Sequence, residues 1–219
     1  MIPMHVEHRG RAGAPPMILV HGFAASNHSW RHWVPGLSER WELHLVELAG
    51  FGRSPVPPDG KMGPLDQARH LGALIRELAP DVPPVLVGHS LGGAVVLAAA
   101  LEMDRPPRAV VVVSGPVYPL KLPPYVSLMR KPGLGRLLAL SAPPRWALRA
   151  GLRGIVHDPA SVTPELVDGY RAPLLSPERR GWIVQAARQL SPRADAHVLV
   201  PRYPELDAPL LALWGEEDP

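Results

Sequence analysis

The sequence predicts an α/β fold built on a mostly parallel sheet that is flanked by helices. Short runs rich in Val, Ile and Leu recur along the chain, with helical stretches between them, at residues 17–20, 43–48, 85–87, 109–113 and 210–214. Continuous apolar runs of this length are typical of strands that are buried on both faces. Strands that alternate with helices in this way form parallel sheets covered by those helices.

Helical spacing is clearest at residues 63–78, where apolar residues recur about one turn apart until Pro80 ends the pattern. After Gly115 the regular alternation stops, and residues 116–207 read as short helices broken by Pro and Gly. We interpret this stretch as a helical lid inserted into an α/β core. Residues 1–115 then form the first part of the core, and residues 208–219 return to it with one more strand and its loop.

Composition narrows the class of protein. A chain of 219 residues, 46% of them hydrophobic, can bury the core of one domain and carry an insertion. The absence of cysteine excludes disulfides, a thiolate nucleophile and cysteine-ligated zinc. The longest apolar run, residues 94–101, is far shorter than the roughly 20 residues of a membrane span. We expect a cytoplasmic protein with no membrane span, and the sequence does not indicate its oligomeric state.

Charge is distributed unevenly along the chain. Residues 116–207 contain 13 basic and 7 acidic residues, a net charge of +6, whereas the remainder contains 10 basic and 13 acidic residues, net −3. The basic residues are scattered, so we expect no nucleic-acid partner. A solvated lid surface explains the excess most simply; steering of an anionic substrate and contact with an acidic surface are the alternatives.

The chemistry is concentrated in Gly88-His89-Ser90-Leu91-Gly92, which follows an apolar strand and precedes the helical AVVLAAAL. This is the G-x-S-x-G pattern in the strand-to-helix context of a nucleophile elbow. The serine sits on a sharp turn, and side chains at the two glycines would collide with the neighbouring strand and helix. We predict that Ser90 is the nucleophile; a structural serine in a turn is the competing interpretation.

Two main-chain amides are candidates for an oxyanion hole. The N–H of Leu91 begins a helix, where unpaired donors and the helix dipole favour a developing negative charge. The second candidate is the N–H of Phe23, because a strand ends there in His21-Gly22-Phe23. The two motifs together favour a nucleophilic serine over a structural one.

Four stretches resemble the α/β-hydrolase superfamily, and within it the lidded group of esterases, carbon–carbon bond hydrolases and cofactor-free haloperoxidase-like proteins. They are ILVHGF, VELAGFGRSP, VGHSLGGAVVLAAA and LLALWGEEDP, in the family's order from residue 17 to residue 219. The resemblance implies that His21 and His89 position loops, that the turn at 50–54 is structural, and that no metal or cofactor is needed. The lid matches in position and character only.

The triad acid follows the nucleophile in this family. The strand run at 109–113 ends in Ser114 with no carboxylate, whereas the run at 210–214 ends in WGEEDP. The resemblance places the acid at Asp218, with Glu216 and Glu217 as alternatives. The family's general base is a histidine beyond the acid.

All ten histidines precede Asp218, and their positions do not predict one over Ser90. His157 and His197, in or near the lid, are expected at the surface. We therefore expect that the base, the last strand and the last helix follow Pro219, so that the chain is a fragment. The run at 210–214 would then lie at an unpaired sheet edge, and the chain would have at most residual activity.

The sequence thus predicts a serine hydrolase that cleaves an ester or related acyl bond, or a C–C bond, of a small and largely apolar substrate through an acyl-enzyme. Serine at position 90 argues against the epoxide hydrolase and haloalkane dehalogenase branches, which need a carboxylate nucleophile. The alternative is a non-catalytic small-molecule receptor on the same scaffold. The large apolar lid residues are candidates for lining the pocket or for packing inside the lid: Met129, Leu137, Leu138, Leu140, Trp146, Tyr170 and Trp182.

Overall fold

The structure is a computed structural model that describes residues 2–115, 118 and 121–218. Its described strands form a six-stranded sheet in the order β1-β3-β2-β4-β5-β6, in which β1 is antiparallel to β3 and every other pair is parallel. The strands are β1 (Val6–Gly10), β2 (Pro16–Val20), β3 (Glu42–Val46), β4 (Val85–His89), β5 (Ala109–Val113) and β6 (Leu210–Leu213). Each of the five predicted apolar runs contains a strand, which confirms the α/β prediction.

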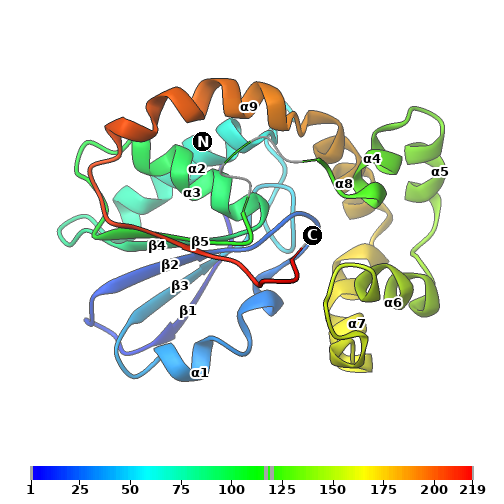
Figure 1. Cartoon of the computed structure of the whole chain (residues 1–219), viewed down its shortest axis with the longest axis horizontal. Coiled ribbons are helices and arrows are strands. Elements are labelled where there is room, and N and C mark those ends of the chain that lie inside the picture. Colours follow the sequence, from blue (N-terminus) through cyan, green and yellow to red (C-terminus); the bar gives the residue numbers. More distant parts are fainter. Residues whose placement is uncertain (1, 116–117, 119–120, 219) are drawn as a thin grey trace.

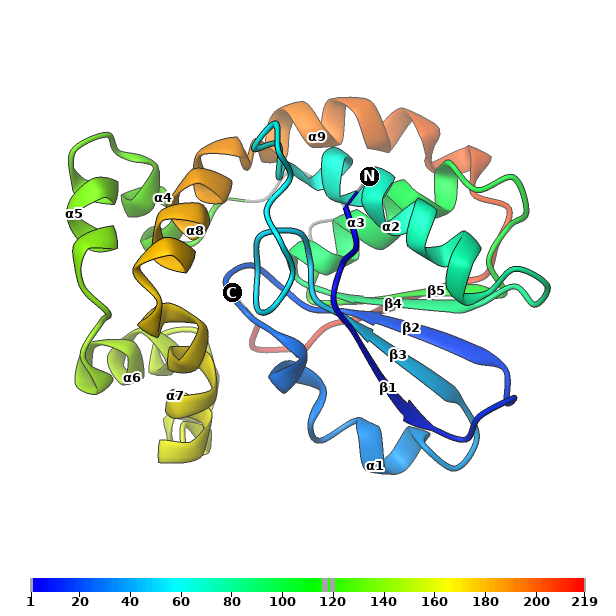
Figure 2. The ribbon, with the colours of Figure 1, turned by 180° about the vertical axis from the view of Figure 1, so that it is seen from behind.

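Helices cover both faces of the sheet (Figures 1 and 2). The short α1 (Val34–Leu37) lies on one face, and α2 (Pro64–Leu78) and α3 (Leu91–Leu101) lie on the other. The side chains of the central strands alternate between the two buried clusters, so Ile18 of β2 joins the α2–α3 cluster while Leu19 joins the α1 cluster. Two covered faces explain why β2 and β5 are apolar at every position and why β3 and β4 are mostly so.

The sequence of α3, LGGAVVLAAAL, contains no charged residue, and all but its last residue are buried. This helix lies between the sheet and other helices, and a helix surrounded on all sides has no polar face. Part of that cover is α9 (Pro192–Leu199), which crosses above α3 in Figure 1 and contributes Leu199 to the same core cluster. The strand β6 differs, because among the described strands it pairs only with β5, and its residues are exposed.

The lid segment forms a group of short helices beyond one end of the sheet (Figure 1). Its elements are α4 (Pro124–Arg130), α5 (Leu134–Leu140), α6 (Arg145–Arg153), η2 (Pro159–Ser161), α7 (Pro164–Arg171), η3 (Ala172–Leu175) and α8 (Pro177–Gln189). The last part of residues 116–207 does not lie with this group of helices. Instead, α9 and η4 (Val200–Glu205) lie over the core helices. No described helix is both long and apolar enough to cross a bilayer.

Side-chain amides on α8 attach the lid helices to the core. Gln189 donates to the carbonyl of Gly60 at 2.8 Å and accepts the N–H of Met62 at 2.7 Å, and Gln185 donates to the same carbonyl at 3.1 Å. Three hydrogen bonds therefore join the loop at residues 60–62 to one face of α8, two donated by the helix side chains and one by the loop. These bonds fix α8 against the core and thereby place the rest of the lid over the end of the sheet.

Candidate active site

Ser90 lies between the end of β4 and the start of α3, in a backbone conformation that side chains rarely adopt. Its φ is 50° and its ψ is −122°. Such a conformation costs about 1–3 kcal/mol and persists only where the surroundings impose it. Two hydrogen bonds do so: the Ser90 N–H donates to the carbonyl of Val113 at 2.9 Å, and its carbonyl accepts the N–H of Gly93 at 2.8 Å.

The two glycines of the motif allow backbone segments to meet at the turn. A Cβ on Gly88 would lie 2.2 Å from the carbonyl oxygen of Gly92, and a Cβ on Gly92 would lie 2.3 Å from that of Val20. Real Cβ atoms do not approach oxygens so closely, so either substitution must push backbone apart. The collisions expected from the sequence are confirmed.

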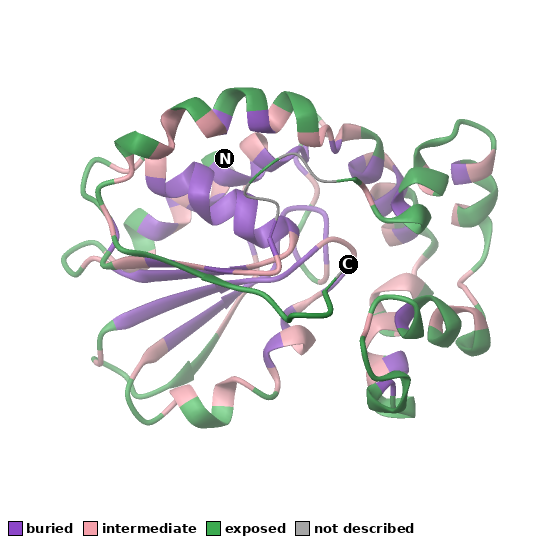
Figure 3. Cartoon of the chain, viewed as in Figure 1, coloured by how far each residue is buried: buried purple, intermediate pink, exposed green. Residues whose placement is uncertain are grey.

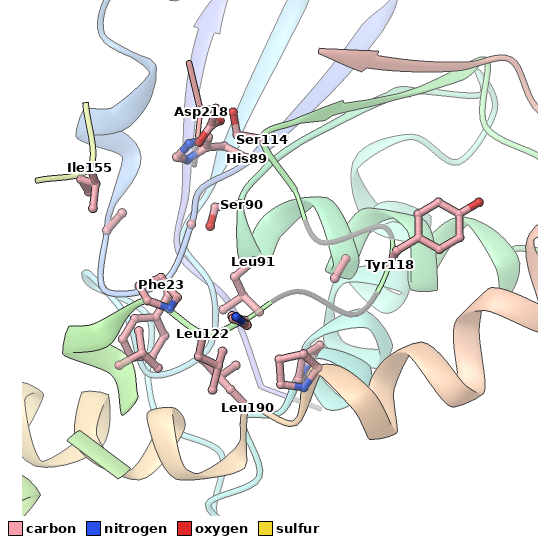
Figure 4. A pocket seen from close by; sticks show the side chains of 18 of the residues that line it. Phe23, His89, Ser90, Leu91, Ser114, Tyr118, Leu122, Ile155, Leu190 and Asp218 are labelled. Carbon is pink, nitrogen blue, oxygen red and sulfur yellow. The ribbon is translucent and has the colours of Figure 1, made fainter. Parts of the chain in front are cut away.

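The Ser90 hydroxyl has no hydrogen-bond partner among the residues that the structure describes. Serine at a helix N-cap commonly accepts a hydrogen bond from the first turn, yet Ser90 makes no side-chain cap bond to α3. The side chain instead lines a cavity of about 670 Å³. In Figure 4 it lies between Phe23 and Leu91 on one side and His89 and Asp218 on the other.

The peptide group between Gly22 and Phe23 is held in place by hydrogen bonds to its carbonyl. The carbonyl of Gly22 accepts from His21 Nδ1 at 2.8 Å and from the N–H of Ala25 at 3.3 Å. In a trans peptide the N–H of Phe23 points away from that carbonyl. A Cβ on Gly22 would lie 3.0 Å from the Cβ of Ser90, so this loop contacts the elbow.

The amide of Leu91 is the first in α3 and has no partner within its own helix. In the part of the chain that the structure describes, neither this N–H nor that of Phe23 donates to a protein acceptor. Phe23 and Leu91 both line the cavity with Ser90. The structure thus places Ser90, Phe23 and Leu91, the three residues that the sequence analysis singled out for the nucleophile and the oxyanion donors, around one cavity.

His21 is completely buried and held in one tautomer. Its Nδ1 donates to the Gly22 carbonyl, and its Nε2 accepts the N–H of Leu48 at 3.1 Å. The pKa of His21 is lowered to about 4, and burial of the ring is the main cause. The ring is therefore neutral at pH 7 and joins the loop after β2 to the end of β3.

The loop after β6 carries the three acidic candidates, and all of them line the cavity: Glu216, Glu217 and Asp218. Asp218 lies beside His89 and Ser114 in Figure 4. Burial lowers the pKa of His89, and the negative charge of Asp218 opposes that effect. Glu217 instead faces His157, which belongs to the lid, with 4.0 Å between Glu217 Oε2 and His157 Nδ1. Asp218 and Glu217 thus face different neighbours across the cavity.

Two histidines line the cavity, His89 and His157. His157 was expected at the surface, and its side chain is indeed largely exposed although it borders the cavity. Among the described residues, neither imidazole forms a hydrogen bond with the Ser90 hydroxyl, and His197 does not line the cavity.

The remaining cavity wall comes from segments without a recognisable motif. Ser114 follows β5, Tyr125 lies on α4 and Asp195 lies on α9. Burial raises the pKa of Tyr125 and that of Asp195. Of the seven large lid residues that were candidates for lining the pocket or for packing inside the lid, Tyr170 borders the cavity and the other six do not. Several of those six face solvent, among them Leu137, Leu140 and Trp146.

The turn at 50–54 is structural, as expected. Ser54 is fully buried, and its hydroxyl donates to the carbonyl of Glu47 at 2.5 Å while accepting the N–H of His5 at 2.8 Å. The buried Glu47 carboxylate accepts the N–H of Arg53 at 2.6 Å and that of Asn27 at 3.4 Å. Glu47, which the sequence analysis missed, thereby ties this turn to the loop that carries Phe23.

The described residues contain no cluster of three or more His, Asp or Glu side chains placed to hold a metal ion.

Comparison with known proteins identifies the relatives of this architecture. Residues 15–151 match the model of the alpha/beta hydrolase fold family. The chain is 25% identical to the hydrolase YugF of Bacillus subtilis over 99% of this chain and 78% of that protein. It is 33% identical to a pimeloyl-[acyl-carrier protein] methyl ester esterase of Aeromonas hydrophila, over 48% of this chain and 39% of that protein. An α/β hydrolase fold protein from Burkholderia ambifaria superposes with a TM-score of 0.82 at 25% identity, covering 98% of this chain and 77% of that one.

The Gly92→Ala substitution tests the close approach of α3 to β2. Its methyl group would meet the carbonyls of Val20 and His21, so we expect a loss of about 2–3 kcal/mol in the free energy of unfolding. Gly72→Ala is the matched control, because a Cβ there meets nothing within 4 Å. That change should stabilise α2 by up to about 1 kcal/mol. Urea unfolding measures both; equal stability of the two variants would contradict the packing.

The low pKa of His21 predicts that stability falls in acid. The unfolded chain takes up this proton near pH 6.5, whereas the folded chain resists it down to about pH 4. Stability is therefore retained above pH 7 and lost between pH 6.5 and 4, by about 3 kcal/mol from this group. Nitrogen NMR of the imidazoles should show the His21 ring neutral and protonated on Nδ1 at pH 5.5. A titration midpoint near 6.5 would contradict the burial of this ring.

Proposed function

This chain belongs to the α/β-hydrolase fold family, and on that premise we propose that it is a serine hydrolase acting on an ester or related acyl bond. The observation that carries the proposal is the Ser90 backbone, whose φ of 50° and ψ of −122° leave the hydroxyl outside the helix cap and in the cavity wall. Such strain in a non-glycine residue is characteristic of functional sites.

In the proposed reaction, Ser90 Oγ attacks the substrate carbonyl carbon and gives its proton to a general base. The carbonyl oxygen becomes an oxyanion that accepts the N–H groups of Phe23 and Leu91. Collapse of this intermediate expels the leaving group, which takes the proton, and water then hydrolyses the acyl-enzyme. A serine at position 90 forms an acyl ester, which suits carbonyl substrates better than epoxides or alkyl halides.

We assign Asp218 as the acid that would orient and stabilise the charged base. Its place beside His89, in the loop after β6, supports this assignment over Glu217, which faces the lid. Neither His89 nor His157 is hydrogen-bonded to the nucleophile. We therefore expect these 219 residues to turn over esters slowly, with the oxyanion donors supplying most of what rate enhancement remains.

The substrate class follows from the cavity. A volume of about 670 Å³ suits a small organic molecule, and most of the wall is carbon from residues such as Leu122, Val126, Ile155 and Leu199. We propose a small, largely apolar acyl substrate. An ester hydrolase among the relatives supports an ester over a C–C bond.

Labelling with a fluorophosphonate tests the nucleophile directly. We expect one phosphonyl adduct, located by peptide mass spectrometry at Ser90, and a slow hydrolysis of p-nitrophenyl butyrate that Ser90→Ala abolishes. Ser114→Ala is the matched control, since Ser114 borders the same cavity and should leave the labelling in place.

Adduct formation at Ser114 or Ser54 in place of Ser90 would refute the assignment. Tight binding of small apolar molecules with no adduct at any serine would instead favour a receptor on this scaffold. Fast turnover abolished by Ser90→Ala would keep the nucleophile and overturn the expected lack of a base.

A further inference from the structure

The lid helices farthest from the sheet combine positive charge with exposed apolar side chains. From residue 105 to residue 157 the chain has nine Arg or Lys residues and no Asp or Glu. This stretch includes α4, α5 and α6. In both ribbon views α5 and α6 lie at the end of the molecule away from the sheet, and exposed residues predominate on them (Figures 1, 2 and 3).

Large apolar side chains face solvent at this end. Leu137 is 60% exposed, and Leu140 and Trp146 are each 75% exposed. None of the three lines the cavity at Ser90. Exposed leucines occur singly on most proteins, but a tryptophan and two leucines within ten residues form an uncommon concentration.

These side chains stand on backbone that is fixed in place. Arg180 on α8 is 7% exposed, and its guanidinium donates to the carbonyls of Ala139 and Leu140 at the end of α5. It also donates to the carbonyls of Leu174 and Leu175, and Leu175 is itself 53% exposed. One buried cation therefore holds two chain segments together and presents Leu140 and Leu175 outward.

Most of the basic side chains near these apolar residues form no ion pair in the described structure. On α4 to α6 and the loop between α4 and α5, Arg145 is paired with Asp168. In the described structure no ion pair involves the others, which are Arg130, Lys131, Arg136, Arg149 and Arg153. Five unpaired cations without a neighbouring acid in the sequence create a positive field at this end of the lid.

We propose that this surface docks on an anionic phospholipid membrane. We call it the lid-tip surface and define it by Leu137, Leu140, Trp146, Arg136 and Arg149. Helices that lie in a bilayer interface are rich in Trp, Leu, Arg and Lys. Here Arg136 lies four residues before Leu140 on α5 and Arg149 three residues after Trp146 on α6, so a cation and an apolar side chain share a face of each helix. Tryptophan favours the headgroup level, and each basic residue near an anionic leaflet strengthens binding about fivefold. The acidic side chains of a protein partner would pair with the cations but would leave the exposed Leu and Trp side chains without an apolar environment. An anionic lipid surface offers both negative headgroups and an apolar interior.

Vesicle sedimentation tests the proposal on the 219-residue protein. We expect binding to phosphatidylcholine vesicles that contain phosphatidylglycerol and at least tenfold weaker binding to phosphatidylcholine alone. The double variant Leu140→Ser/Trp146→Ser should weaken binding about tenfold or more, and Arg136→Gln/Arg149→Gln should do likewise. The second pair alters exposed charges only, so it remains informative if the first variant fails to fold.

Val82→Ser/Arg76→Gln is the matched control, because Val82 and Arg76 are exposed but lie in or just after α2, outside the lid. It should bind as the unaltered protein does. Three results would overturn the proposal: no binding to anionic vesicles, binding lost in about 0.5 M NaCl yet insensitive to Leu140→Ser/Trp146→Ser, or a dimer that the same double variant dissociates. The second result would favour an acidic protein partner.

Discussion

The close contact between the start of α3 and the end of β2 is the constraint on which the site depends. Gly92 lets the helix backbone approach the carbonyl of Val20 where any other residue would hold it off. This approach puts the first amide of α3 next to the loop that carries Phe23. An oxyanion hole needs two donors aimed at one point, and here they come from segments that are about 70 residues apart in sequence. The pairing of β2 with β4 and the packing at Gly92 bring these segments together.

Backbone strain concentrates at the same place. The described non-glycine residues with positive φ are Ala24, Ser90 and Ser114, and each follows the end of one of three neighbouring strands, β2, β4 and β5. Left-handed conformations cost about 1–3 kcal/mol each outside glycine. Hydrogen bonds from β5 and β6 hold two of them, since Ser90 donates to Val113 and Ser114 donates to Leu213. The strands of the sheet thus contribute side chains to the hydrophobic core and also hold the backbone at the cavity in place.

Much of this architecture could be predicted from the sequence because its causes are local. Apolar runs identify strands covered on both faces, and Gly88 and Gly92 identify the turn between strand and helix. The cavity wall could not be predicted in the same way. Tyr125 and Asp195 reach it through the packing of short, proline-bounded helices, which leaves Leu140 and Trp146 in solvent although their apolarity alone suggests a pocket. The role of Glu47 could not be predicted from the sequence either, because a carboxylate shows a structural role only when the positions of the amides that it accepts from are known.

The central claim is that Ser90 and the amides of Phe23 and Leu91 converge on one oxygen atom of the substrate. A crystal structure of the chain after reaction with a fluorophosphonate tests it most directly, because the phosphonyl oxygen takes the place of the oxyanion. We expect that oxygen about 2.7–3.1 Å from both amide nitrogens. A phosphonyl oxygen turned to solvent, or bonded to neither amide, would contradict the account.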